Sequence, residues 1–140
     1  MRRFVTILLL MAFGVTAVAA ADLNAADAKR VRAVIQAQLA AFEVDDAARA
    51  FTFATPKLRE QFGSAETFMQ IVRARYPVVY RHASVAFLKP EREEGSVTQA
   101  VHFTDANGGL WLALYLMEQQ GDGSWRISAC QVVPAEGKAA

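Results

Sequence analysis

The spacing of apolar residues changes at Tyr76-Pro77, and this change limits the fold more than any other feature of the chain. Before it, apolar side chains recur every three or four residues, as they do along one buried side of a helix. After it, four segments alternate with a period of two and are separated by turn-forming residues: 79–88, 97–104, 110–118 and 125–133. Helices followed by hairpin-linked strands predict an α+β domain with a four-stranded antiparallel sheet.

The helical half contains clear start signals. Asn24 can cap a long helix, and Asp45 is the expected N-cap of a short second helix. The buried stripe of the long helix comprises Val31, Val34, Ile35, Leu39 and Phe42. Thr55-Pro56 interrupts the chain after the second helix, and Ser64 caps a further helix over residues 65–75.

The first residues have the pattern of a cleavable signal peptide. Arg2 and Arg3 precede an uncharged apolar segment that ends in the small residues 17–21. This apolar segment is shorter than the roughly 20 residues that a membrane anchor needs. We therefore expect a signal peptide at 1–21, export to the periplasm, one domain at 22–134 and a disordered tail at 135–140.

Charge and cysteine content narrow the choice of partners. Without Arg2 and Arg3, 13 of the 15 basic residues remain against 14 acidic ones, so the mature chain carries a slight negative charge. Nucleic acid is then an unfavourable partner, and no membrane partner is expected after cleavage. Cys130 is the single cysteine, which excludes an internal disulfide and leaves either a buried thiol or a bond to another chain.

The hairpin signals Asn107-Gly108 and Asp122-Gly123 allow the two faces of the sheet to be assigned. With two-residue turns, the face toward the helices carries Gln99, Val101, Phe103, Leu112, Leu114, Leu116, Trp125, Ile127, Ala129 and Gln131. The opposite face then carries His102, Trp111, Ala113, Tyr115, Met117, Ser128, Cys130 and Val132. A loop of three or five residues would exchange the faces at that turn.

Apolar residues on both faces predict that something covers the outer one. An antiparallel sheet with a solvated face normally presents polar side chains there. We therefore expect a symmetric homodimer. Its contact residues on this assignment are His102, Trp111, Tyr115 and Met117.

Several segments of the mature chain resemble the bacterial family called domain of unknown function 4864. They are 34–42, 45–56, 61–63, 68–72, 76–80, 113–115 and 122–128, within a likeness that runs from about Lys29 to Val133. The resemblance implies the nuclear transport factor 2-like, or cystatin-like, superfamily, in which a curved antiparallel sheet cradles helices. That superfamily includes isomerases, dehydratases and polyketide cyclases as well as non-enzymatic binding and dimerisation modules, so the fold leaves the function open.

Polar residues near the expected interior are candidates for ligand binding. Gln38, Gln99 and Gln131 could form a neutral lining, and the alternative is that they satisfy backbone groups near the sheet ends. Tyr76 and Tyr80 could line the mouth of a cavity, or simply pack with their hydroxyls in water. Together they favour a non-catalytic module that binds a small apolar molecule or a protein partner.

The alternative is an acid/base enzyme of isomerase or hydrolase type. Asp45 and Asp46 are its candidate catalytic pair, with His102 as the histidine, although helix capping also explains Asp45. His82, His102 and Cys130 lack the close spacing of metal ligands, and we expect neither a metal nor a cofactor. An acidic or imidazole side chain inside the cavity would favour the enzyme.

Overall fold

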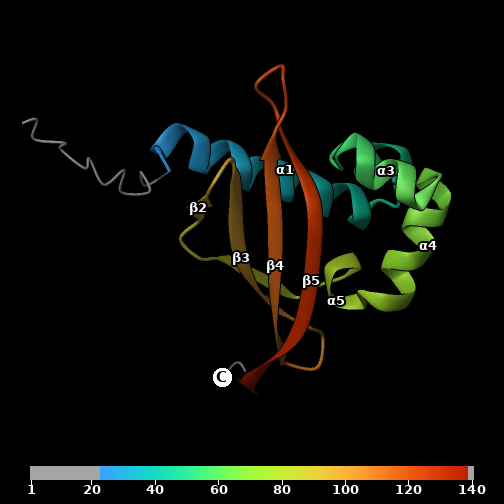
Figure 1. Ribbon diagram of the computed structural model, residues 1–140. Coiled ribbons are helices and arrows are strands. Elements are labelled where there is room, and N and C mark those ends of the chain that lie inside the picture. Colours follow the sequence, from blue (N-terminus) through green and yellow to red (C-terminus); the bar gives the residue numbers. More distant parts are fainter. Residues whose placement is uncertain (1–22, 139–140) are drawn as a thin grey trace, which may run out of the picture.

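The structure, a computed structural model, describes residues 23–138, and the expected signal peptide lies outside these residues (Figure 1). The helices are α1 (Ala25–Glu43), α2 (Ala47–Thr52), α3 (Pro56–Phe62), α4 (Ala65–Arg75) and α5 (Pro77–Tyr80). The strands are β1 (Ser84–Phe87), β2 (Glu91–Glu93), β3 (Ser96–Thr104), β4 (Gly109–Gln119) and β5 (Trp125–Lys138). Helices therefore precede the strands, as the change in period predicts.

Asn24 and Ser64 cap α1 and α4 as predicted, each by accepting a hydrogen bond from a backbone N–H three residues later. Thr55, which was expected only to interrupt the chain, caps α3 in the same way. Helix α2 is capped by Asp46 and not by Asp45. Asp45 instead adopts a left-handed backbone conformation, with φ of 54°, between α1 and α2.

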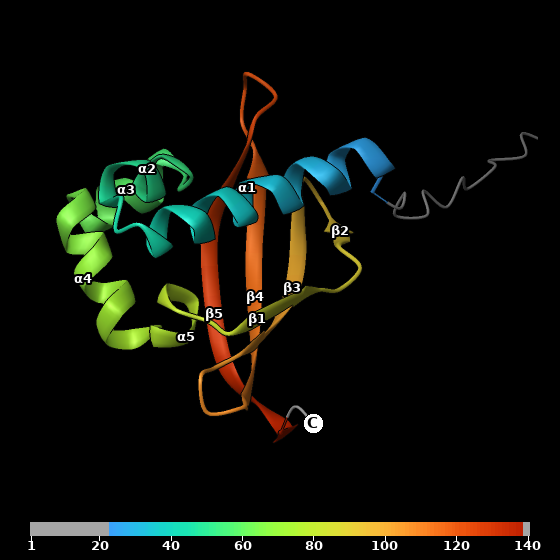
Figure 2. The ribbon, with the colours of Figure 1, turned by 180° about the vertical axis from the view of Figure 1, so that it is seen from behind.

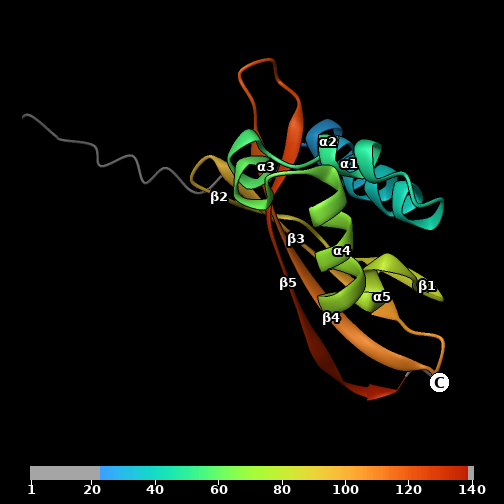
Figure 3. The same ribbon diagram turned by 90° about the vertical axis from the view of Figure 1, so that its right-hand side faces the viewer.

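The sheet is antiparallel, with strand order β1-β3-β4-β5, and β2 adds a fifth strand beside the first residues of β3. The helices cover one face, where α1 crosses behind the strands in Figure 1 and in front of them in Figure 2. Figure 3 shows the long strands β4 and β5 curving, with α1, α4 and α5 to one side. The domain is thus α+β with an open antiparallel sheet.

Two expected boundaries differ in the structure. The segment 79–88 does not begin as a strand, because Pro77 starts the short helix α5 and β1 begins only at Ser84. Strand β5 continues to Lys138, beyond the expected domain end at residue 134. Within the described residues, none of the helices combines the length and the apolar character needed to span a bilayer.

The face assignment of β4 was wrong because an odd number of residues separates the last paired positions of β3 and β4. Thr104 pairs with Leu110, so five residues, 105–109, lie between these partners, the last of them being the first residue of β4. Asp105 organises this loop by accepting hydrogen bonds from the N–H groups of Asn107 and Gly109 and from the indole of Trp111. The odd loop length exchanges the two faces of β4 relative to β3.

The exchange changes which residues form the core. Tyr115 and Met117 are buried on the helix-facing side, so they cannot form the predicted subunit contact. Trp111 is opposite Phe103 on the same inner side and is partly buried. His102 remains on the outer face, opposite Leu112. The outer row of β4 consists of Leu110, Leu112, Leu114 and Leu116.

Strand β5 changes face along its length. Met117 pairs with Ile127 and Leu116 with Ala129, so Ser128 is an extra residue in the ladder. Trp125 and Ile127 lie buried on the inner side, as predicted. After the bulge, Ala129 and Gln131 lie on the outer side, contrary to the prediction.

Candidate functional site

A cavity of about 280 Å³ lies between the helices and the inner side of β4 and β5. Its wall contains residues from α1, α3, α4, α5 and both strands. The lining residues are Gln38, Phe42, Leu58, Gln61, Phe62, Phe68, Val72, Tyr76, Val79, Tyr115, Ser128, Ala129 and Cys130. Among residues 23–138, no charged or imidazole side chain lines this cavity, which we call the interior cavity.

Aromatic rings form much of its wall. Phe68 of α4 contacts Phe62 and Phe42, with ring centroids 5.1 and 5.9 Å apart, and Phe51 packs behind it at 5.6 Å. These tilted and edge-on arrangements are favourable geometries for aromatic pairs. The wall therefore offers a bound molecule a rigid, apolar surface.

Tyr115 is the most deeply buried polar side chain of the wall, with 1% of its surface exposed. No group among the described residues meets hydrogen-bond geometry with its hydroxyl; the thiol of Cys130, a weak partner, lies close enough to affect the pKa of Tyr115. Burial raises the pKa of Tyr115 well above its usual value of 10.0, so the phenol stays neutral. It can therefore donate a hydrogen bond to a ligand in the cavity.

Cys130 is opposite Tyr115 in the β4–β5 ladder and also lines the interior cavity. Burial raises the pKa of its thiol to about 12. The thiolate is the nucleophilic and metal-binding form of cysteine, and it is scarce at neutral pH here. Cys130 therefore acts as a small apolar wall residue.

Gln38 reaches the same cavity from α1. Its side-chain amide donates to the carbonyl of Ala50 at 3.1 Å, which ties α1 to α2. Tyr76, at the end of α4, is a second lining residue from the predicted set. The structure thus brings two of the five ligand-binding candidates into one cavity.

The other three candidates lie elsewhere. Gln99 is 1% exposed and donates to the carbonyls of Leu88 and Ala100, in agreement with the backbone-satisfying alternative. Gln131 is opposite Leu114 on the outer face and is exposed. The hydroxyl of Tyr80 donates a hydrogen bond to the carboxylate of Asp45, outside the interior cavity.

Asp45 is the centre of a surface cluster that contains Arg73, Tyr80 and Arg81. Arg73 and Arg81 donate to its two carboxylate oxygens at 3.1 and 3.2 Å, and both guanidinium groups lie over the ring of Tyr80. The hydrogen bond from Tyr80, followed by that from Arg73, lowers the pKa of Asp45 below its usual value of 3.8. The cluster joins the α1–α2 turn to α4 and α5.

The remaining catalytic candidates are also outside the interior cavity. Asp46 accepts from the backbone of Arg49 as the α2 cap, and His102 lies on the outer face of the sheet. The imidazole of His82 packs edge-on against the ring of Phe103, and its Nε2 lies 3.8 Å from Oε1 of Glu43. Among residues 23–138, no three His, Cys, Asp or Glu side chains are grouped so as to hold a metal ion.

Sequence reasoning missed Tyr115 and Cys130 as cavity residues because it placed them on the outer face. The signal for the longer loop was present in Asp105-Ala106-Asn107-Gly108-Gly109. An aspartate that can accept backbone N–H groups, followed by two glycines, favours a loop longer than a two-residue turn. Gln38 could be found because it interrupts an apolar helical stripe.

These features define a mixed α+β domain in which helices cover one face of an antiparallel sheet and enclose an uncharged cavity. The chain belongs to the family described as "Domain of unknown function (DUF4864)", which it matches over residues 24–140. A search of curated proteins found no match to this sequence.

Proposed function

We propose that this protein is a non-catalytic binding module that holds a small, uncharged and mainly apolar molecule in the interior cavity. The observation that carries the proposal is the buried Tyr115 hydroxyl, which has no hydrogen-bond partner among residues 23–138 and lies in a mainly apolar wall. A buried polar group without a partner is costly, and a ligand with a hydrogen-bond acceptor would satisfy it.

Size and charge define the ligand further. The interior cavity is slightly smaller than the roughly 300–1,000 Å³ of typical small-molecule sites, which favours a compact ligand. An ionic ligand would lose its hydration without gaining an opposite charge, because no lining residue is charged. A neutral ring or branched chain with one carbonyl or ether oxygen fits this environment.

The enzyme alternative has less support. General acid/base catalysis requires a titratable group within hydrogen-bond reach of the substrate. Asp45, Asp46 and His102 do not line the interior cavity, and the Tyr115 and Cys130 side chains there are held neutral by burial. A binding module therefore accounts for the residues of the interior cavity without requiring a catalytic group there.

We further propose a nuclear transport factor 2-like cone for the architecture and the periplasm for the location. A curved open sheet with helices over one face, and a cavity between the layers, supports the first proposal. The sequence pattern of residues 1–21 supports the second.

Native mass spectrometry of the protein purified from its periplasmic fraction tests the ligand proposal. We expect a co-purified small molecule that is lost in Val72→Phe, which fills the cavity, and retained in Val133→Phe, the same change on the outer face. The bound molecule appears as an increase in the mass of the protein. Loss of this increase in both variants, or its retention in both, would contradict binding in the interior cavity.

A second proposal is a symmetric dimer through the outer sheet face, with contact residues different from those predicted. Leu114 and Val133 expose 37% and 36% of their surface there, on a face that the helices leave uncovered. The same apolar row on a second copy is self-complementary about a two-fold axis. Light scattering should give a dimer mass for the wild type and a monomer mass for Leu114→Glu, and a monomeric wild type at 100 µM would exclude this dimer.

A further inference from the structure

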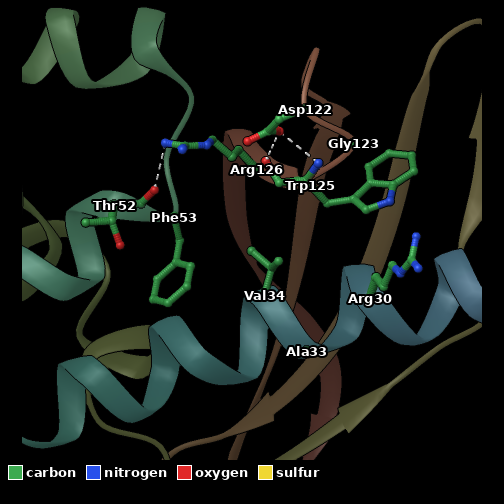
Figure 4. Close-up of a pocket in the computed structure, with 10 residues that line it drawn as sticks. Arg30, Ala33, Val34, Thr52, Phe53, Asp122, Gly123, Trp125 and Arg126 are labelled. Carbon is green, nitrogen blue, oxygen red and sulfur yellow. Dashed lines mark hydrogen bonds between the residues drawn. The ribbon is translucent and has the colours of Figure 1, made fainter.

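A second hollow lies outside the interior cavity, between α1 and the β4–β5 hairpin (Figure 4). It has a volume of about 650 Å³ and shares no lining residue with the interior cavity. The residues that matter for its chemistry are Arg30, Val34, Phe53, Asp122, Trp125 and Arg126. We call it the α1–hairpin groove.

The middle of the groove is apolar. Val34 projects from α1 and Phe53 from the end of α2, and both side chains are partly buried (Figure 4). Trp125 forms the wall on the side of Arg30 and is 4% exposed. An alkyl chain or a ring placed here would be removed from water on several sides.

Arg30 supplies a positive charge that the protein compensates only weakly. Its side chain is 66% exposed, and its nearest carboxylate, that of Asp27, is 3.7 Å away. Asp27 is also 4.0 Å from Arg92, so one carboxylate serves two guanidinium groups. Arg30 is thus available to an anion at one end of the groove.

Arg126 supplies a second positive charge at the other end. Its guanidinium donates to the carbonyl of Thr52 at 3.0 Å (Figure 4). The nearby Asp122 carboxylate is held by the hydroxyl and the N–H of Ser124 at 2.6 and 3.0 Å. Arg126 also attracts Asp122 electrostatically, so a carboxylate that itself lines the groove lies near the positive charge at this end.

The Trp125 indole adds an independent observation. Its Nε1–H is buried and has no acceptor among the described residues. The other indole, that of Trp111, donates to Asp105 at 2.9 Å. A buried indole normally finds an acceptor, so the Trp125 donor points to a missing one.

We propose that the α1–hairpin groove binds an amphiphilic carboxylate. The carboxylate accepts hydrogen bonds from the Arg30 guanidinium and the Trp125 indole, and the apolar part lies over Val34 and Phe53. A charge-assisted contact to Arg30 gives the site its preference for an anion over a neutral molecule of the same length. This binding is separate from the uncharged ligand proposed for the interior cavity.

Two-dimensional NMR of the ¹⁵N-labelled mature protein tests the proposal, with sodium octanoate and 1-octanol as matched probes. The chain has two tryptophans, so each indole N–H gives its own signal. We expect octanoate to shift the Trp125 signal and to leave the Trp111 signal in place, and octanol to bind the groove at least about tenfold more weakly. Shifts at Tyr115 and Cys130 without a shift of the Trp125 signal would place octanoate in the interior cavity and would overturn the proposal.

Variants of α1 provide the control. Arg30→Gln should raise the octanoate dissociation constant about tenfold. Arg32→Gln should leave it unchanged, because Arg32 lies over the ring of Phe87 and outside the groove. Equal effects of the two substitutions, equal binding of octanoate and octanol, or a Trp125 signal that octanoate does not move would each overturn the proposal.

Discussion

Tyr115 and Cys130 are directly opposite each other in the β4–β5 ladder, and both side chains line the interior cavity. Burial raises the pKa of each, so both the phenol and the thiol stay neutral at neutral pH. The pair therefore makes the cavity suited to an uncharged molecule.

Removal of the Tyr115 hydroxyl should not destabilise the fold. The hydroxyl is buried and has no hydrogen-bond partner in the described part of the chain, so Tyr115→Phe should leave the free energy of unfolding unchanged or raise it by up to about 1 kcal/mol. Urea unfolding measures this difference. Tyr80→Phe is the matched control and should be destabilising, because Tyr80 donates to Asp45.

Cys130 should react slowly with thiol reagents in the folded protein. Because its pKa is raised to about 12, the thiolate fraction should rise about tenfold for each pH unit between 8 and 10. Alkylation by iodoacetamide, followed by mass spectrometry, measures the rate. In urea the same cysteine should react much faster at pH 8, and equal rates in the two states would show that the thiol is accessible.

The raised pKa of Cys130 also predicts a loss of stability in alkali. The folded state holds the thiol in its neutral form, so folding is fully favoured only while the unfolded chain also keeps the thiol neutral. The stability of the fold is therefore unaffected by this thiol below the ordinary pKa of 9.0, and it decreases as the pH rises from 9.0 toward about 12. Unfolding by urea at pH 8, 9 and 10 should give decreasing free energies for the wild type. Cys130→Ala, which has no thiol to ionise, should show a smaller decrease.

Asp45 should stabilise the protein at neutral pH and lose this effect in acid. Its pKa is lowered in the folded state, so its contribution is present above the ordinary value of 3.8 and disappears as the pH falls through the lower, folded-state value. Asp45→Asn keeps a residue that tolerates positive φ and removes the charge. We expect a lower melting temperature at pH 7, with a difference from the wild type that narrows toward pH 2.5. A constant difference would show that the ion pairs with Arg73 and Arg81 contribute nothing.

Gln99 should be a structural residue and Gln131 should not. Gln99→Met removes a buried donor to the carbonyls of Leu88 and Ala100, and we expect a loss of roughly 1–3 kcal/mol in the free energy of unfolding. Gln131→Met is the same change at an exposed position on the outer face and should cost less than about 0.5 kcal/mol. Chemical denaturation of the two variants compares them directly.

Most of the helices and the order of the elements could be predicted from the sequence, because they depend on contacts within a few residues. Asn24 and Ser64 cap helices by accepting a backbone N–H three positions later, so each signal is complete in the local sequence. The change of period near Tyr76-Pro77 likewise separates the helical half from the strands, although α5 extends the helices to Tyr80. The interior position of Gln38 followed from the helical stripe on which it lies.

Which sides of β4 and β5 meet the helices, and which residues enclose a cavity, follow only from the packed structure. The face of β4 depends on the loop held by Asp105, and the face of β5 after residue 128 depends on the bulge at Ser128; each adds a residue to the pairing that strand periodicity does not reveal. One added residue moves Tyr115 from a predicted subunit contact to the wall of the interior cavity. The cavity itself is formed by residues from six elements, and their proximity arises only when the sheet and the helices pack together.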